Sequence, residues 1–288
     1  MRTTILFALV ILMAIGAICI QYYYPQYAEQ VKKNLDSNQL VNDTINKTPA
    51  NTSLLPTYLT IANWNLQIFG QDKARNATLM AAYARVISQY DIIFIQEIRD
   101  ESGTAFPALC ALLPAYNCIN SSRAGSTSSK EQYGLIYKKG LLLREVRDYN
   151  EGANQQLFER PPMAAVFEMN IRTIESHPNV TIWVIHTKPE AAGQELANLE
   201  MLIGKSQNVN GKIIVIGDTN YACSYVTKNE KRPFAAWDWV ISDDADTTVS
   251  PTTCAYDRII TNFVYSQAGI YTNITKDMSD HYLVWVKI

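Results

Sequence analysis

The sequence lacks a strong charge of either sign. Its 288 residues carry a formal net charge of −2. The chain as a whole therefore has no attraction for nucleic acid, and phosphate binding would have to come from local cations and a metal ion. No internal repeat is apparent, which excludes the repeat architectures. Histidine is scarce, with three in the chain, whereas the apolar fraction of 48% is ample for the core of one large domain or two small ones.

One apolar run stands out at the N-terminus. Residues 3–20 carry no charge and are about as long as a membrane-spanning helix needs. This length favours a retained transmembrane anchor over a cleaved secretory signal, which is the alternative. Arg2 is the only basic residue before Lys32, and this places the N-terminus inside and the rest of the chain outside. We therefore expect a transmembrane or signal helix over residues 1–20 and an extracytoplasmic protein, either membrane-anchored or secreted.

The cysteines and the glycosylation motifs agree with export. Apart from Cys19, four cysteines remain, an even number as disulfides in an oxidising compartment require; buried free thiols are the alternative. These four are Cys110, Cys118, Cys223 and Cys254. Asn-X-Ser/Thr motifs are in excess of what composition gives, and they predict a glycoprotein if the host glycosylates: Asn42, Asn46, Asn51, Asn76, Asn120, Asn179 and Asn273.

The composition changes twice along the chain. Residues 21–57 lack glycine and show no sustained apolar period, so we expect a polar stalk or linker there. From 58 to 288 short β-rich runs alternate with helical stretches, which predicts a single layered α/β domain with sheets between helices. The expected strands are 59–65, 91–97, 133–138, 142–148, 164–171, 181–187, 212–218, 257–262 and 281–288. The expected helices are 77–89, 103–113 and 190–207, with Ser102 capping the second.

Polar side chains close several of these strands. Asp218 and Asn220 follow a buried strand and point to one side if the chain is extended, which suits a hard cation or a phosphate. Alone, an Asp in this place is more often a turn or cap residue. Glu97 ends another apolar strand, as Asn65 ends the first, and a Glu so placed is a good magnesium ligand. A salt bridge between Glu97 and Arg99 is the alternative.

Two of the histidines lie in polar motifs. His186 ends the strand T-I-W-V-I, and His281 follows Ser279 and Asp280 at the start of the last strand. An isolated histidine at a strand end is more often structural. Two of them, each with a candidate carboxylate partner, indicate acid–base catalysis, because histidine titrates near neutral pH and a carboxylate fixes its tautomer.

The order of these motifs resembles the endonuclease/exonuclease/phosphatase superfamily, and within it the deoxyribonuclease I branch. The most specific stretches are Y-D-I-I-F-I-Q-E-I-R-D at 90–100, C-S-Y-V-T at 223–227 and A-D-T-T…C-A-Y-D-R-I within 245–259. The last two favour the nuclease branch over lipid or inositol phosphatases. The resemblance implies a four-layered α/β sandwich, with two central mixed β-sheets packed face to face and helices outside. It also implies cleavage of double-stranded DNA with Mg²⁺ or Mn²⁺.

Carried over residue by residue, the resemblance assigns roles across the domain. Glu97 would be the principal metal ligand, with Asn65, Asp218, Asn220 and Asp280 around the metal and the scissile phosphate. His186 would pair with Glu131 and His281 with Asp257, one imidazole activating water and the other protonating the leaving 3′ oxygen. Arg160 and Gln96 would bind phosphate or DNA, and Arg99 would enter the minor groove. A structural Ca²⁺ loop would comprise Asp246, Thr248, Ser250 and Thr252, and Cys223–Cys254 would be the family disulfide.

The sequence also departs from this family. Ser129 stands where the family stacks a tyrosine in the minor groove, a second calcium loop before Arg160 is replaced, and Cys110 and Cys118 are extra and should pair. We expect a monomeric, divalent-metal-dependent endonuclease of low sequence specificity that leaves 5′-phosphate ends. The alternatives are a phosphodiesterase of the same fold acting on a lipid head group at the membrane, sphingomyelinase- or phosphoinositide-phosphatase-like, and a non-catalytic binding protein.

Overall fold

The computed structural model describes residues 58–126, 129–169, 179–206, 211–226 and 231–288. The expected anchor at 1–20 and the stalk at 21–57 lie outside these ranges. Within them, no helix combines the length and the apolar character that crossing a membrane requires.

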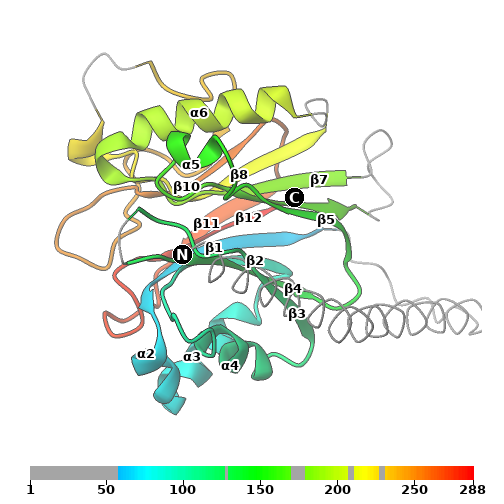
Figure 1. Cartoon of the computed structure of the whole chain (residues 1–288), viewed down its shortest axis with the longest axis vertical. Helices are drawn as coiled ribbons and strands as arrows, with labels where there is room; N and C mark the ends of the chain where they lie inside the picture. The colour runs from blue at the N-terminus through cyan, green and yellow to red at the C-terminus, as the bar shows by residue number, and fades with distance from the viewer. Residues whose placement is uncertain (1–57, 127–128, 170–178, 207–210, 227–230) are drawn as a thin grey trace, which may run out of the picture. The chain divides into compact units, whose positions relative to one another are not determined.

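Two six-stranded sheets form the centre of the domain (Figure 1). The first sheet has the order β11-β12-β1-β2-β4-β3 and the second the order β5-β6-β7-β8-β10-β9. The strands of the first sheet are β1 Thr60–Phe69, β2 Ile92–Ile98, β3 Tyr116–Asn120, β4 Gln132–Lys138, β11 Gln267–Tyr271 and β12 Leu283–Lys287. Those of the second are β5 Leu142–Asp148, β6 Met163–Glu168, β7 Asn179–Val184, β8 Lys212–Asp218, β9 Asp238–Trp239 and β10 Asp257–Thr261.

Both sheets are mixed. β1 pairs with β2 in parallel, and β7 pairs with β8 in parallel, whereas the other neighbours are antiparallel. The strands β2 and β8 are buried along almost their whole length, as their continuous isoleucine-rich runs require. Each of these strands is therefore covered by other parts of the protein on both faces.

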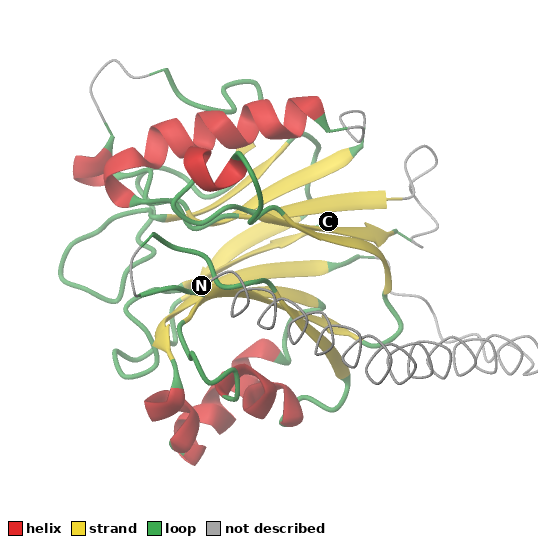
Figure 2. Ribbon diagram, viewed as in Figure 1, coloured by secondary structure: helices red, strands yellow, loops and turns green. Residues whose placement is uncertain are grey.

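The sheets face each other across an apolar core. One cluster joins side chains of both sheets, among them Ile61, Phe94, Leu135, Val184 and Ile214. The helices α2 Gln71–Arg75, α3 Ala77–Ile87 and α4 Ala105–Ala111 lie on the outside of the first sheet, and α5 Asn154–Leu157 and α6 Ala192–Lys205 on the outside of the second (Figure 2). The expected α/β sandwich is therefore present.

Some local predictions need correction. The carboxylate of Asp100, and not Ser102, accepts the backbone N–H groups of Thr104 and Ala105 at the start of α4, at 2.7 Å each. The expected helix 190–207 is preceded and partly replaced by a 3₁₀ turn, Pro189–Ala191, and the regular helix α6 begins at Ala192.

Both expected disulfides are confirmed. Cys110 is bonded to Cys118 and Cys223 to Cys254, with Cα atoms 6.3 Å and 5.9 Å apart respectively. The second bridge closes a loop of 31 residues and lies three residues after Asn220 and three before Asp257. It therefore fastens together two segments that carry predicted site residues.

Candidate active site

The polar residues predicted from the strand ends meet at one edge of the two sheets. The first sheet contributes Asn65 on β1 and Glu97 on β2, with Glu131 just before β4 and His281 just before β12. The second sheet contributes Asp218 at the end of β8, Asp257 at the start of β10 and His186 just after β7. The topology thus brings together seven residues that span more than two hundred positions of the sequence.

The strands β1 and β2 are irregular where they reach this edge. Their register shifts between Asn65 and Phe69, and the backbone has positive φ at Gln67 (46°), Ile68 (54°) and Glu97 (59°). Non-glycine residues seldom adopt this conformation, and it concentrates at functional sites. One result is that the Ile68 N–H points at Glu97 and donates to its Oε2 at 2.9 Å.

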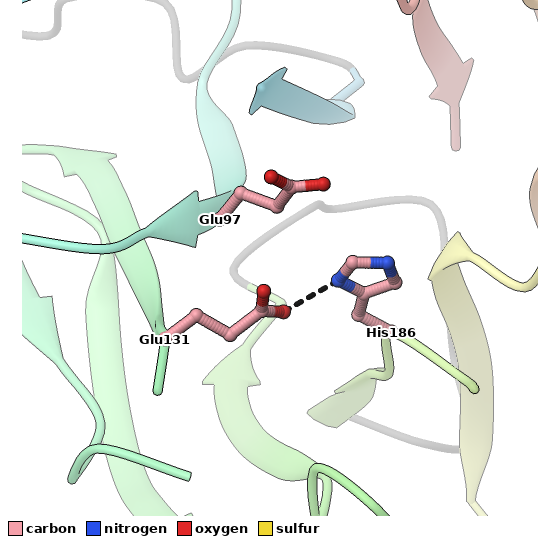
Figure 3. Close-up of side chains that lie close together, drawn as sticks. All are labelled: Glu97, Glu131 and His186. Atoms are coloured by element: carbon pink, nitrogen blue, oxygen red, sulfur yellow. Dashed lines mark hydrogen bonds and ion pairs between the residues drawn. The ribbon is translucent and has the colours of Figure 1, made fainter. Parts of the chain in front are cut away.

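The first histidine pair crosses from one sheet to the other. Nδ1 of His186 lies 2.5 Å from Oε1 of Glu131, and both side chains are buried (Figure 3). Two guanidinium groups flank this carboxylate, with Nε of Arg160 3.3 Å from Oε1 and Nε of Arg99 3.5 Å from Oε2. A buried carboxylate with this many cationic partners is held ionised and fixes the imidazole ring in place.

The second histidine pair also crosses between the sheets. Nδ1 of His281 lies 2.7 Å from Oδ2 of Asp257, whose side chain is fully buried. The backbone N–H of Asp257 donates to Oγ1 of Thr247, and the N–H of His281 donates to Oγ of Ser279, both at 3.0 Å. Each member of the pair is therefore held by a neighbouring hydroxyl group.

Both imidazoles direct their second nitrogen at one carboxylate. Nε2 of His186 is 3.4 Å and Nε2 of His281 is 3.5 Å from Oδ2 of Asp218. The same oxygen accepts a hydrogen bond from Nδ2 of Asn65 at 3.1 Å. Asp218 therefore marks the point on which both candidate acid–base groups converge.

The neighbouring carboxylates raise the pKa of both rings. Burial lowers the pKa of His281, but the carboxylates of Asp257 and Asp218 outweigh it and raise this pKa to about 10. Burial likewise lowers the pKa of His186, and Glu131 and Asp218 overcome this, so the net shift is upward. Burial raises the pKa of Asp218, but the two imidazolium charges outweigh it and lower the pKa below the usual range.

The acidic residues at this edge suit a divalent cation. Glu97, Glu131 and His186 each place one ligand atom within 4.8 Å of the others, and Figure 3 shows the carboxylate of Glu97 beside the hydrogen-bonded pair. Arg99 pairs with both carboxylates, but Glu131 is also bonded to His186 and Arg160, so Glu97 is the better ligand of the two. Oδ1 of Asp280 is buried and accepts no hydrogen bond from the described residues. Carboxylate and amide oxygens are the ligands that Mg²⁺ and Mn²⁺ prefer.

The predicted DNA-binding residues differ in position. Arg99 is partly exposed, donates to Oγ of Ser129 at 3.1 Å and lies 2.9 Å from Glu97, at the edge of the acidic group. Arg160 is nearly buried and donates to the carbonyls of His186 and Thr187 at 2.9 and 2.6 Å. It therefore braces the segment that carries His186.

Gln96 does not reach the surface. Its side chain is fully buried between the sheets, and its carboxamide is bonded to Asn63, Ile185 and Asp218. The prediction that it binds phosphate or DNA does not fit this position, because the period of two in a strand turns Gln96 inward when Glu97 faces the edge.

The predicted calcium loop gathers its oxygen atoms. Oδ1 of Asp246 and Oγ1 of Thr248 are 3.0 Å apart, Oγ of Ser250 is 3.1 Å from that hydroxyl, and the carbonyl of Thr252 is 2.7 Å from it. The backbone of Thr248 also forms an isolated antiparallel β-bridge with the backbone of His281. A cation held here would therefore stabilise the backbone beside the second histidine pair.

Three further residues at the site gave no sequence signal. Gln67 donates to Oδ2 of Asp280 at 2.9 Å. Nζ of Lys73 donates to the carbonyls of Leu66 and Met278 at 2.7 and 3.0 Å, which ties β1 to the segment before Asp280. The hydroxyl of Tyr133 accepts from the His186 N–H at 3.0 Å. Only their tertiary contacts identify them.

Comparison with known proteins agrees with this arrangement. The model of the Endonuclease/Exonuclease/phosphatase family matches residues 62–281, and the chain belongs to this family. Its branch is the deoxyribonuclease I-like one, and the protein is a metal-dependent, phosphodiester-hydrolysing deoxyribonuclease.

Two relatives illustrate the similarity. Deoxyribonuclease gamma of Mus musculus is 32% identical over 70% of this chain and 70% of its own length. Deoxyribonuclease-1 of Homo sapiens is 29% identical over 80% of this chain and 92% of its own length. Among solved structures, an endonuclease/exonuclease/phosphatase from Bacteroides vulgatus shares the fold, with a TM-score of 0.56, 18% identity, and coverage of 81% of this chain and 98% of that one.

Proposed function

We propose that this protein is a Mg²⁺- or Mn²⁺-dependent endonuclease that nicks double-stranded DNA with low sequence specificity outside the cytoplasm and leaves 5′-phosphate ends. The observation that carries the proposal is the convergence of two histidine–carboxylate pairs on Asp218, at 3.4 and 3.5 Å from its Oδ2. Hydrolysis of a phosphodiester needs one group that accepts a proton from water and one that donates a proton to the leaving oxygen. Two carboxylate-stabilised imidazoles on either side of one point meet this requirement.

The residues divide the reaction between them. One imidazole takes a proton from the water that attacks phosphorus in line, and the other, as imidazolium, gives a proton to the leaving 3′ oxygen. Glu131 and Asp257 orient the rings and stabilise their charged form. Asn220, whose Nδ2 donates to the Thr187 carbonyl at 3.1 Å, would contact the reacting phosphate. A divalent ion held by Glu97 with Asn65 and Asp280 would neutralise charge that develops on the phosphoryl oxygens.

Low specificity follows from the groups that face the substrate. Arg99 carries a charge that recognises phosphate and the shape of the minor groove, which do not distinguish base sequence well. Ser129 supplies a hydroxyl in place of an aromatic ring at the same edge. We infer that binding of a DNA duplex depends on charge more than on stacking of an aromatic side chain in the minor groove.

Two features support a location outside the cytoplasm. The two disulfides form and persist in oxidising compartments and are rare in the cytosol. The sequons at Asn120, Asn179 and Asn273 lie on exposed residues, where an attached glycan can be accommodated.

A plasmid assay tests the proposal. The purified chain should nick supercoiled plasmid in the presence of Mg²⁺ and fail when EDTA is added. His281→Ala should lose activity, while Lys139→Ala, a change at an exposed lysine between β4 and β5, should keep it. DNA ligase should reseal the nicks without prior phosphorylation, because it needs a 5′ phosphate. If plasmid stays intact while sphingomyelin or a phosphoinositide is cleaved, the nuclease proposal is wrong.

A further inference from the structure

Gln96 occupies an unusual place between the two sheets. It belongs to β2 of the first sheet, is 0% exposed, and reaches across to the second sheet. Its Nε2 donates to the carbonyl of Ile185 at 2.7 Å, and its Oε1 accepts from the backbone N–H of Asp218 at 2.9 Å. One carboxamide thus contacts the two strands that carry His186 and Asp218.

These contacts replace a rung of the β7–β8 ladder. The Ile185 N–H donates to the Ile216 carbonyl at 3.1 Å, and the Thr187 N–H donates to the Asp218 carbonyl at 3.2 Å. In a regular parallel ladder a third hydrogen bond would lie between these two bonds, donated by the Asp218 N–H to the Ile185 carbonyl. Both of those groups are bonded to Gln96 instead, so the side-chain amide is inserted where a direct bond would be.

Gly217 makes the insertion possible. It stands opposite the inserted amide with φ of +150°, and a Cβ atom built on it would lie 1.9 Å from the Ile185 carbonyl oxygen and 2.9 Å from Nε2 of Gln96. No side chain fits at these distances, and only glycine adopts this backbone conformation readily. The absence of a side chain at Gly217 therefore leaves the space that the Gln96 carboxamide occupies.

Asn63 adds a third hydrogen bond to the amide, whose orientation is set by the Asp218 N–H and the Ile185 carbonyl. Its Nδ2 donates to Oε1 of Gln96 at 2.9 Å, and Asn63 is also fully buried. Oε1 thus accepts two N–H groups, and this leaves Nε2 facing the carbonyl of Ile185. Reversing the amide would place donors against donors at two buried contacts, a cost of about 1–3 kcal/mol for each unsatisfied group.

We propose that Gln96 is a positioning residue for the hydrolytic centre, which it serves by holding β7 and β8 at the separation that places His186 and Asp218 opposite each other. The inference rests on the proposed function of that centre, because the spacing matters to catalysis only if both residues act on the substrate. The side chain of Gln96 is fully buried and is bonded to protein groups alone, so it would not contact a metal or phosphate at the edge of the sheets. Its effect is transmitted through the backbone. The Ile185 carbonyl directly precedes His186, and the N–H group that Gln96 binds belongs to Asp218 itself.

A measurement that does not depend on activity tests the insertion itself. Gln96→Met keeps a side chain of similar length and removes all three hydrogen bonds of the carboxamide. Amide hydrogen exchange followed by NMR should show the Asp218 N–H exchanging at least tenfold faster than in the wild type. The Val240 N–H, bonded to the Ile259 carbonyl at 2.9 Å in the same sheet, should be unchanged. Equal exchange of Asp218 in both proteins would overturn the insertion.

Kinetics on plasmid test the positioning role. Gln96→Met should lower kcat about 100-fold, since a misplacement of about 1 Å costs this much, and leave KM for DNA unchanged because no substrate contact is lost. The matched control is Gln89→Met, the same change at an exposed glutamine, which should behave as the wild type. Asn63→Ser, which frees the amide without removing it, should change both readouts in the same direction by less, and it serves if Gln96→Met does not fold.

The outcomes separate the two proposals. A wild-type kcat in Gln96→Met with accelerated exchange at Asp218 would leave the insertion standing and overturn the positioning role. A wild-type protein that does not cut plasmid would instead refute the nuclease function, while the exchange experiment would still decide whether the amide completes the ladder.

Discussion

Replacing Asp100 by asparagine tests how α4 is held at its start. The two carboxylate oxygens accept five hydrogen bonds within this segment. Oδ1 accepts from the N–H and hydroxyl of Ser102 at 3.1 and 2.7 Å, and Oδ2 from the N–H groups of Thr104 and Ala105 at 2.7 Å each and from the Thr104 hydroxyl at 3.4 Å. An amide in the same place turns one acceptor into a donor. Two N–H groups, or one N–H and a hydroxyl, would then face an NH₂ group.

The expected cost follows from these contacts. A side chain that caps a helix contributes about 1–2 kcal/mol, and hydrogen bonds to a charged acceptor contribute more than neutral ones. We expect Asp100→Asn to lower the free energy of unfolding by about 2 kcal/mol, and the melting temperature by about 4–8 °C for a domain of this size. Asp72→Asn is the matched control, because Asp72 lies in the first turn of α2 with a fully exposed side chain.

The pKa of Asp100 predicts how the stability difference between the wild type and Asp100→Asn changes with pH. Burial raises the pKa of Asp100, but the hydrogen bonds from Ser102, Ala105 and Thr104 outweigh it and hold the pKa well below its usual range. A depressed carboxyl pKa contributes stability that is fully present above the unfolded value of about 4 and is lost as the pH falls below it. Urea unfolding at pH 7.5, 5, 4 and 3 should show a constant difference between the two proteins down to pH 5 and a shrinking one below pH 4. Equal midpoints at pH 7.5, or a difference that grows on acidification, would refute this reasoning.

Three further changes have defined outcomes. Arg99→Gln should raise KM for plasmid about tenfold and flatten its dependence on salt, measured by initial nicking rates at increasing NaCl, because one cation at the substrate edge is lost. Replacing both Cys223 and Cys254 by serine should lower the free energy of unfolding by about 3–4 kcal/mol in urea titrations, since the bridge closes a 31-residue loop. Asp246→Ala should abolish any rise in melting temperature on addition of Ca²⁺; an unchanged rise would place the calcium elsewhere.

Strand ends were the part of the fold that sequence patterns predicted best. The buried isoleucine-rich runs near 92–95 and 213–216 became β2 and β8, and the polar residues that follow them meet at one edge. Short elements escaped prediction. β3, β9 and β11 lie at or beside sheet edges and are half exposed, so their residues carry little alternation, and α2 and α5 are too short to show a helical period.

The sequence allowed the types of the site residues to be predicted, but not the distances between them. The types of Glu97, His186 and His281 at strand ends are visible in the sequence, but the distances that pair them depend on how the two sheets pack. Gln96 shows this limit most clearly, because the family resemblance places it with the DNA-binding residues whereas its side chain is buried in the interior. The alternation along β2 turns Gln96 away from the side of Glu97, but nothing in the local pattern reveals that Gln96 there meets Ile185 and Asp218 of the second sheet, or that Glu97 has a positive φ.

Each histidine–carboxylate pair has one member in each sheet. A chain in which both sheets have formed but have not yet packed together holds every catalytic residue and no catalytic centre. Cutting of DNA therefore requires the two sheets to be packed against each other, and any change that separates them removes both pairs at once.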